Sequence, residues 1–375
     1  MSSLLAPQPI PWLTPELPGS GGAARVSEED FRVEELPLYP ASGEGDHLFV
    51  TIEKIGRTTQ EVAQELGRAL QVAGRDVGLA GLKDKRAVTV QRMSVPLPRG
   101  SAGPAASDKA LAFRDRALLA QGPGWKVLAA ERHGNKLRTG HLAGNRFTVV
   151  LRGCAPGARA RAEAVLVRLR ALGPANLFGP QRFGRRGDNA DLGAAILKRA
   201  PEATQAARDR FLRKLALSAL QAEIFNRCLA ARIEDGLYQT ALLGDVLKKR
   251  DSGGLFTCRD LAADLPRVER FEVDPAGPLP GRAPSLAEGE VLEREAEVLR
   301  QTGLLPALFA APVGGELEGT RRPYRIPLAD AALEEQDGGA LVLRFTLPPG
   351  SFALSVLREV MKDGQPLDVD ERPEV

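Results

Sequence analysis

Residues 77–95 read VGLAGLKDKRAVTVQRMSV and combine strand-forming segments with a charged turn. Both ends of this stretch are rich in β-branched and apolar residues, which predicts two strands joined by a tight turn. One carboxylate, Asp84, lies in that turn. It has three cationic neighbours: Lys83, Lys85 and Arg86. Nearby positive charge favours the ionised carboxylate that a nucleophile or general base needs, although a solvated turn of mixed charge is an alternative interpretation.

Outward from this turn, strands and helices are both expected. A helix should begin at Thr58 or Thr59, because Val62, Leu66 and Leu70 repeat every four residues. Further helices are expected at 109–119, 158–172, 210–235, 286–301 and 351–362. Strands are expected at 30–38, 46–54, 77–80, 88–95, 125–131, 146–152, 324–328 and 340–347.

The block from 174 to about 311 is mainly helical in pattern and contains a Pro/Gly-rich stretch at 274–284. Strands occur before and after this block. We therefore expect an α+β protein in which the first and last parts share one sheet, interrupted by a second domain.

The composition is that of a globular protein, with 375 residues of which 43% are hydrophobic. No apolar run approaches the length that spans a bilayer. Residues 1–22 lack the features of a secretory signal and are expected to form a flexible N-terminal tail. Cys154, Cys228 and Cys258 form no CxxC pair, which argues against a zinc site or a disulfide scaffold, favours buried cysteines, and fits a cytoplasmic location.

Positive charge is concentrated in one segment. Residues 131–186 contain twelve Lys/Arg and two Asp/Glu, whereas the whole chain has a net charge of only +3. Such a segment favours a polyanionic partner, and an arginine-rich solvated helix face is the alternative.

Several kinds of chemistry lack their sequence signatures. There is no dinucleotide-binding GxGxxG, no P-loop, no GxSxG elbow and no RNA-recognition motif with clustered aromatics. His47, His133 and His141 have no metal-ligand spacing. An enzyme of this sequence would work without an obvious cofactor, with a carboxylate as catalyst.

Five short motifs occur along the chain: EDFRV at 29–33, GLKDKRAVT at 81–89, GNRFT at 144–148, NLFGPQRFG at 176–184 and PGSFA at 349–353. In this order they resemble motifs of the TruD family of tRNA pseudouridine synthases. The stretch at 81–89 resembles the family's GxKDKxAxT motif. Leu177 departs from the usual aromatic residue and Pro349 from the usual small residue.

The resemblance implies specific roles. Asp84 would be the catalytic aspartate that isomerises a uridine, expected at position 13 of tRNA, without cofactor or metal. It would either attack the sugar anomeric carbon or abstract the 2′ proton, and the sequence leaves both routes open. Arg25 would pair with Asp84. Three residues, Phe31, Asn145 and Phe352, match substrate-binding positions, and Phe147 would stack on the target base.

Six basic residues are candidates for contact with the RNA backbone: Lys83, Lys136, Arg138, Arg182, Arg185 and Arg186. The resemblance also implies a pseudouridine-synthase fold with a central, mostly antiparallel sheet. That catalytic domain would comprise residues 23–172 and 330–375, with a TruD-specific α/β domain inserted at 173–329. The partner would be tRNA, with no membrane, metal or protein partner implied. Two alternatives are a non-catalytic RNA-binding protein and a pseudouridine synthase that acts on another RNA.

Overall fold

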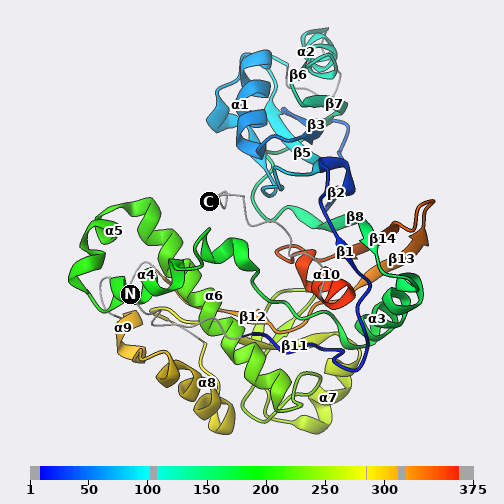
Figure 1. Ribbon diagram of the computed structural model, residues 1–375. Helices are drawn as coiled ribbons and strands as arrows, with labels where there is room; N and C mark the ends of the chain where they lie inside the picture. Colours follow the sequence, from blue (N-terminus) through cyan, green and yellow to red (C-terminus); the bar gives the residue numbers. More distant parts are fainter. Residues whose placement is uncertain (1–8, 102–107, 284, 311–316, 363–375) are drawn as a thin grey trace.

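A computed structural model describes residues 9–101, 108–283, 285–310 and 317–362. Its larger sheet has ten strands in the order β13-β14-β8-β2-β5-β3-β7-β6, with β1 paired to β8 and β4 to β5 (Figure 1). Among the described strands of this sheet, only the β2–β5 pairing is parallel. The strands are β1 (Gly21–Ala23), β2 (Phe31–Pro37), β3 (His47–Ile55), β4 (Gly78–Leu79), β5 (Val88–Pro96), β6 (Gln121–Gly122), β7 (Trp125–His133), β8 (Leu142–Cys154), β13 (Ala329–Glu335) and β14 (Leu341–Leu347). The expected α+β class with a central, mostly antiparallel sheet is confirmed.

A second, four-stranded sheet has the order β10-β9-β11-β12. Its strands are β9 (Val246–Lys249), β10 (Leu255–Thr257), β11 (Val273–Leu279) and β12 (Thr320–Pro323). The helices around it are α4 (Asn189–Leu197), α5 (Thr204–Arg208), α6 (Arg210–Glu234), α7 (Leu261–Glu269), α8 (Gly289–Gln301) and α9 (Pro306–Ala310). The long α6 packs against β11. All of these elements fall between two strands of the larger sheet, β8 and β13, as expected for an insertion.

The remaining helices accompany the larger sheet. They are α1 (Thr59–Leu70), α2 (Asp108–Leu118), α3 (Ala158–Leu172) and α10 (Leu354–Met361), with short 3₁₀ turns η1 (Glu28–Asp30), η2 (Gly74–Asp76), η3 (Pro180–Phe183) and η4 (Pro201–Ala203). α1 and α2 lie together at one end of the sheet, and α3 and α10 lie near β8 and β14 (Figure 1). Within the described part of the chain, no helix is both long and apolar enough to cross a membrane.

The first helix begins where the sequence predicted. Thr58 caps α1 by accepting a hydrogen bond from the Glu61 N–H, and the Glu61 carboxylate in turn accepts a bond from the Thr58 N–H. This capping box satisfies donors that the first turn would otherwise leave unpaired. The predicted stripe of Val62, Leu66 and Leu70 is buried against β3 and β5 residues. This fixes the start of α1 beside the 81–87 turn.

Residues 9–22 do not form the flexible tail that was predicted. The buried Glu359 carboxylate on α10 accepts hydrogen bonds from the Leu13 N–H at 3.0 Å and from the Thr14 hydroxyl at 2.9 Å. The Ser20 N–H donates to the Val360 carbonyl at 2.7 Å. A buried carboxylate needs such donors, and this segment supplies them. Residues 1–8 lie outside the described residues.

One strand prediction was wrong in the second half. Residues 324–328 form only an isolated bridge, Ala175 to Arg325, and the strands lie on either side of them as β12 and β13. The Arg325 side chain is buried in an ion pair with Asp274, 2.7 Å away, which holds this segment between the strands. The Pro/Gly-rich stretch at 274–284, for which no strand was predicted, overlaps β11. Of the cysteines, Cys228 and Cys258 are buried as expected, but Cys154 is half-buried.

Candidate active site

Asp84 lies in the 81–87 loop between β4 and β5, and its nearest charged partner is Arg25. The Arg25 Nη2 atom is 2.7 Å from Asp84 Oδ2, and the two side chains are 6% and 33% exposed. Among the described residues, the other carboxylate oxygen, Oδ1, accepts no hydrogen bond. One oxygen is thus held by a buried guanidinium while the carboxyl group remains accessible to a substrate.

Arg25 is itself fixed in place. Its guanidinium carbon lies 3.9 Å from the centroid of the Phe31 ring, so the cation stacks on an aromatic face. Its backbone has φ of 58°, in the left-handed region that side-chain-bearing residues seldom adopt. A strained, buried arginine that contacts a carboxylate is typical of a functional site.

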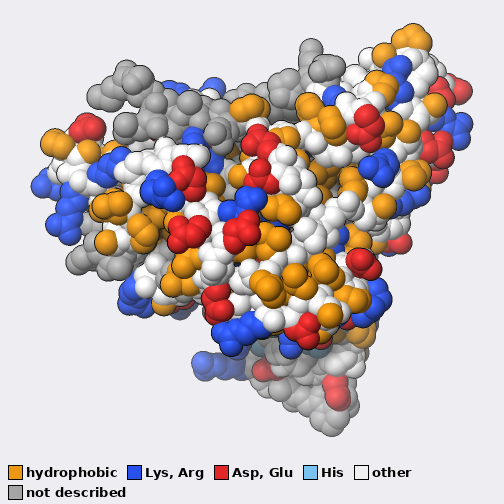
Figure 2. Space-filling model, turned by 90° about the horizontal axis from the view of Figure 1, so that it is seen from below, with side chains coloured by type: hydrophobic (Ala, Val, Ile, Leu, Met, Phe, Trp, Pro, Cys, Tyr) orange, Lys and Arg blue, Asp and Glu red, His pale blue; other side chains and the backbone are white. Residues whose placement is uncertain are grey.

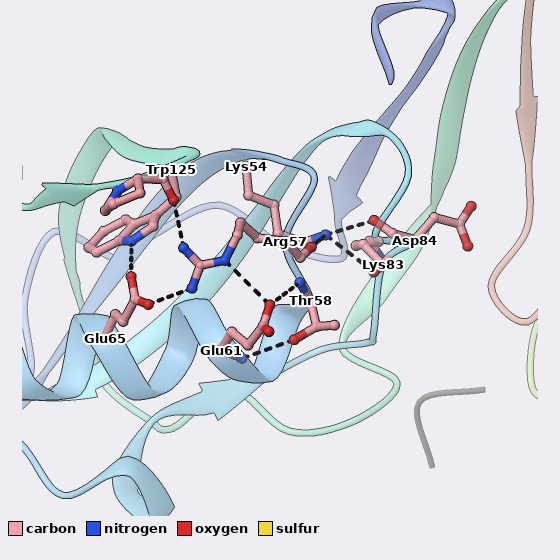
Figure 3. Close-up of polar contacts among 9 residues, drawn as sticks. Lys54, Arg57, Thr58, Glu61, Glu65, Lys83, Asp84 and Trp125 are labelled. Atoms are coloured by element: carbon pink, nitrogen blue, oxygen red, sulfur yellow. Dashed lines mark hydrogen bonds and ion pairs between the residues drawn. The ribbon is translucent and has the colours of Figure 1, made fainter. Parts of the chain in front are cut away.

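A buried lysine holds the backbone of the Asp84 loop. Lys54 on β3 is fully buried, and its ammonium donates to the carbonyls of Asp84 at 2.7 Å, Lys83 at 3.3 Å and Arg57 at 2.7 Å (Figure 3). The Thr59 hydroxyl accepts from the Lys83 N–H at 2.9 Å. The loop is therefore tied to β3 and to the start of α1 on the N-terminal side of the carboxylate.

A second set of contacts in Figure 3 anchors the segment that leads into α1. Arg57 Nη2 lies 2.5 Å from Glu65 Oε1, and the Trp125 indole donates to the other Glu65 oxygen at 2.6 Å. These two hydrogen bonds lower the pKa of Glu65. Arg57 also donates to the Pro123 carbonyl at 2.6 Å. The Arg57 side chain is thus held by contacts to α1 and to the β6–β7 turn. These contacts also fix the position of the Arg57 carbonyl, which accepts the hydrogen bond from Lys54.

Lys83 does not lie where an RNA-backbone contact requires. Its ammonium is 2.8 Å from Glu35 Oε2 on β2, and the two side chains are 5% and 2% exposed. The charge is already neutralised inside the protein, because an unpaired buried ammonium would be costly. The prediction for Lys83 is therefore corrected: it is an internal ion pair beside the loop. Sequence reasoning missed both Glu35 and Lys54.

Asn145 lies next to this ion pair. On β8 it pairs with Glu35 of β2 on one side and with Leu347 of β14 on the other. Its Oδ1 atom is buried and has no hydrogen-bond partner among the described residues. A buried amide oxygen without a partner is uncommon and suits contact with a ligand donor. Gly144, just before it, is needed because a Cβ atom there would come 2.6 Å from the Leu347 carbonyl oxygen.

The predicted substrate rings fall into two groups. Phe31 and Phe147 are buried in the core, edge to face with centroids 6.1 Å apart, and Phe147 also stacks on Phe345 at 5.3 Å. Phe31 reaches the site through Arg25, whose guanidinium covers it. Phe352 is half-buried and lies with Phe178 instead, 6.5 Å away between centroids. Their roles in substrate binding stay predictions.

The other predicted backbone contacts differ in exposure. Arg138, Arg185 and Arg186 are exposed, whereas Lys136 is half-buried and donates to the Arg75 carbonyl at 2.8 Å. Arg182 is half-buried over the Phe178 ring, and burial lowers its pKa. Among the described residues, no group of three or more His, Cys, Asp or Glu side chains is arranged to hold a metal ion.

The mostly antiparallel sheet, with an arginine-paired aspartate on a loop between strands, matches the pseudouridine-synthase fold that the motifs implied. The chain belongs to the TruD family: the model of that family, described as tRNA pseudouridine synthase D, matches residues 10–208 and 202–360.

Relatives and a solved structure agree with this assignment. The chain is 51% identical over 363 residues to tRNA pseudouridine synthase D of Anaeromyxobacter dehalogenans (strain 2CP-1), a match that covers 96% of this chain and 99% of the relative. It is 42% identical to the protein of the same name from Thermus thermophilus, over 96% and 95% of the two chains. The structure described as the putative tRNA pseudouridine synthase D from Methanosarcina mazei is similar with a TM-score of 0.74 and 25% identity, and the match covers 94% of this chain and 96% of the other.

Proposed function

We propose that this protein isomerises a uridine of tRNA to pseudouridine, with Asp84 as the catalytic residue and position 13 as the target. The observation that carries the proposal is the Asp84 carboxylate, one third exposed, with Oδ2 paired to Arg25 and Oδ1 without a hydrogen-bond donor among the described residues. An ionised carboxylate in this arrangement suits a nucleophile or a general base. The family membership of the chain supports the same reaction.

The reaction conserves all atoms of the uridine. The bond between the ribose anomeric carbon and a uracil nitrogen breaks, the base turns, and a ring carbon bonds to the same ribose carbon. The proton of that ring carbon is replaced by one on the nitrogen. Asp84 serves either as the nucleophile at the anomeric carbon or as the base for the 2′ proton. In both routes, Arg25 would orient the carboxylate through Oδ2 while Oδ1 faces the sugar.

The remaining roles form part of the same proposal. The free Oδ1 of Asn145 would accept a hydrogen bond from the substrate. Phe352 would stack on a base, and Arg138, Arg185 and Arg186 would contact phosphates. The catalytic domain would comprise residues 23–172 and 330–375, and the protein would act in the cytoplasm.

The test maps pseudouridine chemically in unmodified tRNA after incubation with wild-type protein and with Asp84→Ala. We expect product at position 13 with the wild type only, and similar tRNA affinity for both proteins. Product formation by Asp84→Ala, or none by the wild type, would refute the proposal. Binding without product would favour a non-catalytic RNA-binding protein, and product in ribosomal or messenger RNA alone would favour another substrate.

A further inference from the structure

Three cationic side chains from separate segments lie close together beside the second sheet. Arg182 lies in η3, Lys248 on β9 and Arg322 on β12. The guanidinium carbons of Arg322 and Arg182 lie 4.3 Å and 5.5 Å from the centroid of the same Phe178 ring. Sequence reasoning identified only Arg182, because the other two are more than 60 residues away along the chain. We call these three residues the basic cluster.

Arg322 is oriented by neutral oxygens. Its Nε donates to the Asn176 carbonyl at 3.0 Å, and its Nη2 donates to the Asn176 side-chain oxygen at 2.5 Å and to the Gly350 carbonyl at 3.0 Å. None of these partners carries a charge. Among the described residues, Nη1 has no hydrogen-bond partner. The guanidinium is therefore fixed in direction while its positive charge is not neutralised.

No carboxylate compensates the basic cluster. Among the described residues, none of its members forms an ion pair within 4.0 Å of an acidic side chain. Burial, and after it the charge of Arg182, lower the pKa of Arg322 to about 10. Burial and the charge of Arg322 likewise lower the pKa of Lys248. Three half-buried like charges repel each other, and an anion would relieve that repulsion.

Several other arginines in the second half are paired with carboxylates. Figure 2 shows the face below α7 and α8, where blue and red side chains lie side by side. Arg294 on α8 is 2.7 Å from Asp235, and Arg267 on α7 is 2.7 Å from Asp264. The lack of acidic partners is thus a property of the basic cluster and not of this region as a whole.

The basic cluster lies beside the loop that carries the predicted stacking residue. The Arg322 guanidinium carbon is 6.0 Å from the Phe352 ring centroid, and its Nη2 bonds the carbonyl of Gly350 in the same loop. A ring that stacks on a base and a guanidinium that binds the adjoining phosphate are the two contacts that an unstacked nucleotide needs.

We propose that Arg322, Arg182 and Lys248 bind a phosphodiester of the substrate RNA next to the nucleotide that stacks on Phe352. This inference rests on the proposed function. The Nη1 group of Arg322 keeps its N–H donors for a phosphate oxygen, Arg182 adds a second guanidinium, and Lys248 adds a point charge. The site extends RNA binding to strands β9 and β12, which lie outside the segment of concentrated positive charge at 131–186.

The test measures binding of an unmodified tRNA transcript at salt concentrations between about 50 and 200 mM. It compares the wild type with Lys248→Gln, Arg322→Gln and Arg322→Lys. The matched control is Arg294→Gln, whose guanidinium is already paired with Asp235. Lys248→Gln should disturb the fold least. Among the described residues, the Lys248 ammonium makes only one long hydrogen bond, of 3.5 Å to the Arg321 carbonyl.

For Lys248→Gln and Arg322→Gln, we expect the salt dependence of binding to weaken. The magnitude of the slope of log affinity against log salt should decrease by roughly 0.7–0.9, the value for one lost phosphate contact. The apparent affinity should fall about fivefold or more, with KM raised and kcat changed less than about twofold. Arg322→Lys should keep the salt slope while losing affinity, since it keeps the charge but not the hydrogen bonds to Asn176 and Gly350 that orient the group. Arg294→Gln should match the wild type.

Two results would overturn the inference while leaving the proposed function intact. In the first, the wild type is active, but Lys248→Gln and Arg322→Gln have the same salt slope as the wild type. If Arg322→Gln then differs only by a lower melting temperature, the role of these residues is purely structural. The second is tight binding of inorganic phosphate at constant ionic strength that leaves tRNA binding unaffected, which would assign the site to a free anion. An inactive wild type would instead overturn the proposed function.

Discussion

Replacing Lys54 by methionine tests whether the position of the Asp84 loop depends on one buried ammonium. Methionine has a similar length and flexibility, so it fills the same space without the charge. Three carbonyl oxygens, of Arg57, Lys83 and Asp84, would lose their donor. Each buried acceptor left unpaired costs about 1–3 kcal/mol. Since the Asp84 side chain is one third exposed, water can reach part of the loop, and we expect a total loss of about 2–4 kcal/mol.

The larger effect should be on catalysis. Lys54 bonds the backbone of Asp84 itself, so its loss lets the carboxylate shift relative to Arg25 and the sugar. A displacement of about 1 Å at a reacting group can cost about 100-fold in rate. We expect kcat to fall between about 10-fold and 100-fold, with tRNA affinity within about twofold of the wild type.

The measurements are single-turnover pseudouridine formation, tRNA binding and urea unfolding. The control is Lys126→Met on β7, whose ammonium is 3.2 Å from Glu53 but whose side chain is 58% exposed. Such a surface pair contributes about 0–1 kcal/mol, so the control should resemble the wild type. If Lys54→Met unfolds more easily yet keeps its wild-type kcat, the ammonium stabilises the fold without positioning Asp84, and the reasoning fails.

Three further outcomes are expected. Arg25→Gln should lower kcat by about tenfold or more, because Asp84 loses its charged partner; unchanged single-turnover rates would contradict this. Phe352→Ala should cost about 1–3 kcal/mol in kcat/KM, the value of a base–aromatic stack. Burial raises the pKa of Asp30, but hydrogen bonds from Arg152 and Ser27 outweigh it and lower the pKa overall. The stabilisation from Asp30 is therefore present above its unfolded pKa of about 4 and is lost as pH falls through the folded value, so the stabilities of wild type and Asp30→Asn should converge in acid.

The sequence was sufficient to place Asp84 and its immediate partner. The turn at 81–87, the helix that begins after Thr58, and the Asp84–Arg25 pair all occur where expected. These features depend on local sequence patterns or on short sequence motifs. The ion pair between Lys83 and Glu35 depends on a contact between strand β2 and the loop, which no local pattern specifies, and it reversed the prediction for Lys83.

Lys54 could have been found from strand periodicity. Leu48, Val50, Ile52 and Lys54 alternate along β3, so they share one face, and the first three are buried hydrophobic residues. A lysine at the end of an apolar stripe must either leave the core or find acceptors. Two of its three acceptors, the carbonyls of Lys83 and Asp84, come from a loop 29 and 30 residues away, so the burial was predictable but these partners were not.

The strand β11, in contrast, could not be predicted from its local sequence. Its sequence, VDPAGPL, has two prolines and reads as a connection. In the structure, residues 273–275 pair with β9 and residues 276–279 pair with β12. Each part of the strand thus has its ladder on one side only, so each proline can lie where its missing N–H is not required. That arrangement follows from the order of the sheet and is not visible along the chain.

The departure at Leu177 lies in the buried core. Leu177 and Phe178 are both buried in the main core, and the Phe178 ring also receives the two guanidinium groups of the basic cluster. The Asn226 side chain holds the Phe178 backbone by bonding its N–H and its carbonyl, each at 2.9 Å. These two hydrogen bonds hold the backbone in the orientation that turns the Phe178 ring, and not the residue 177 side chain, toward the arginines. A leucine at 177 therefore affects packing in the core. The aromatic contact on which the basic cluster depends is supplied at 178.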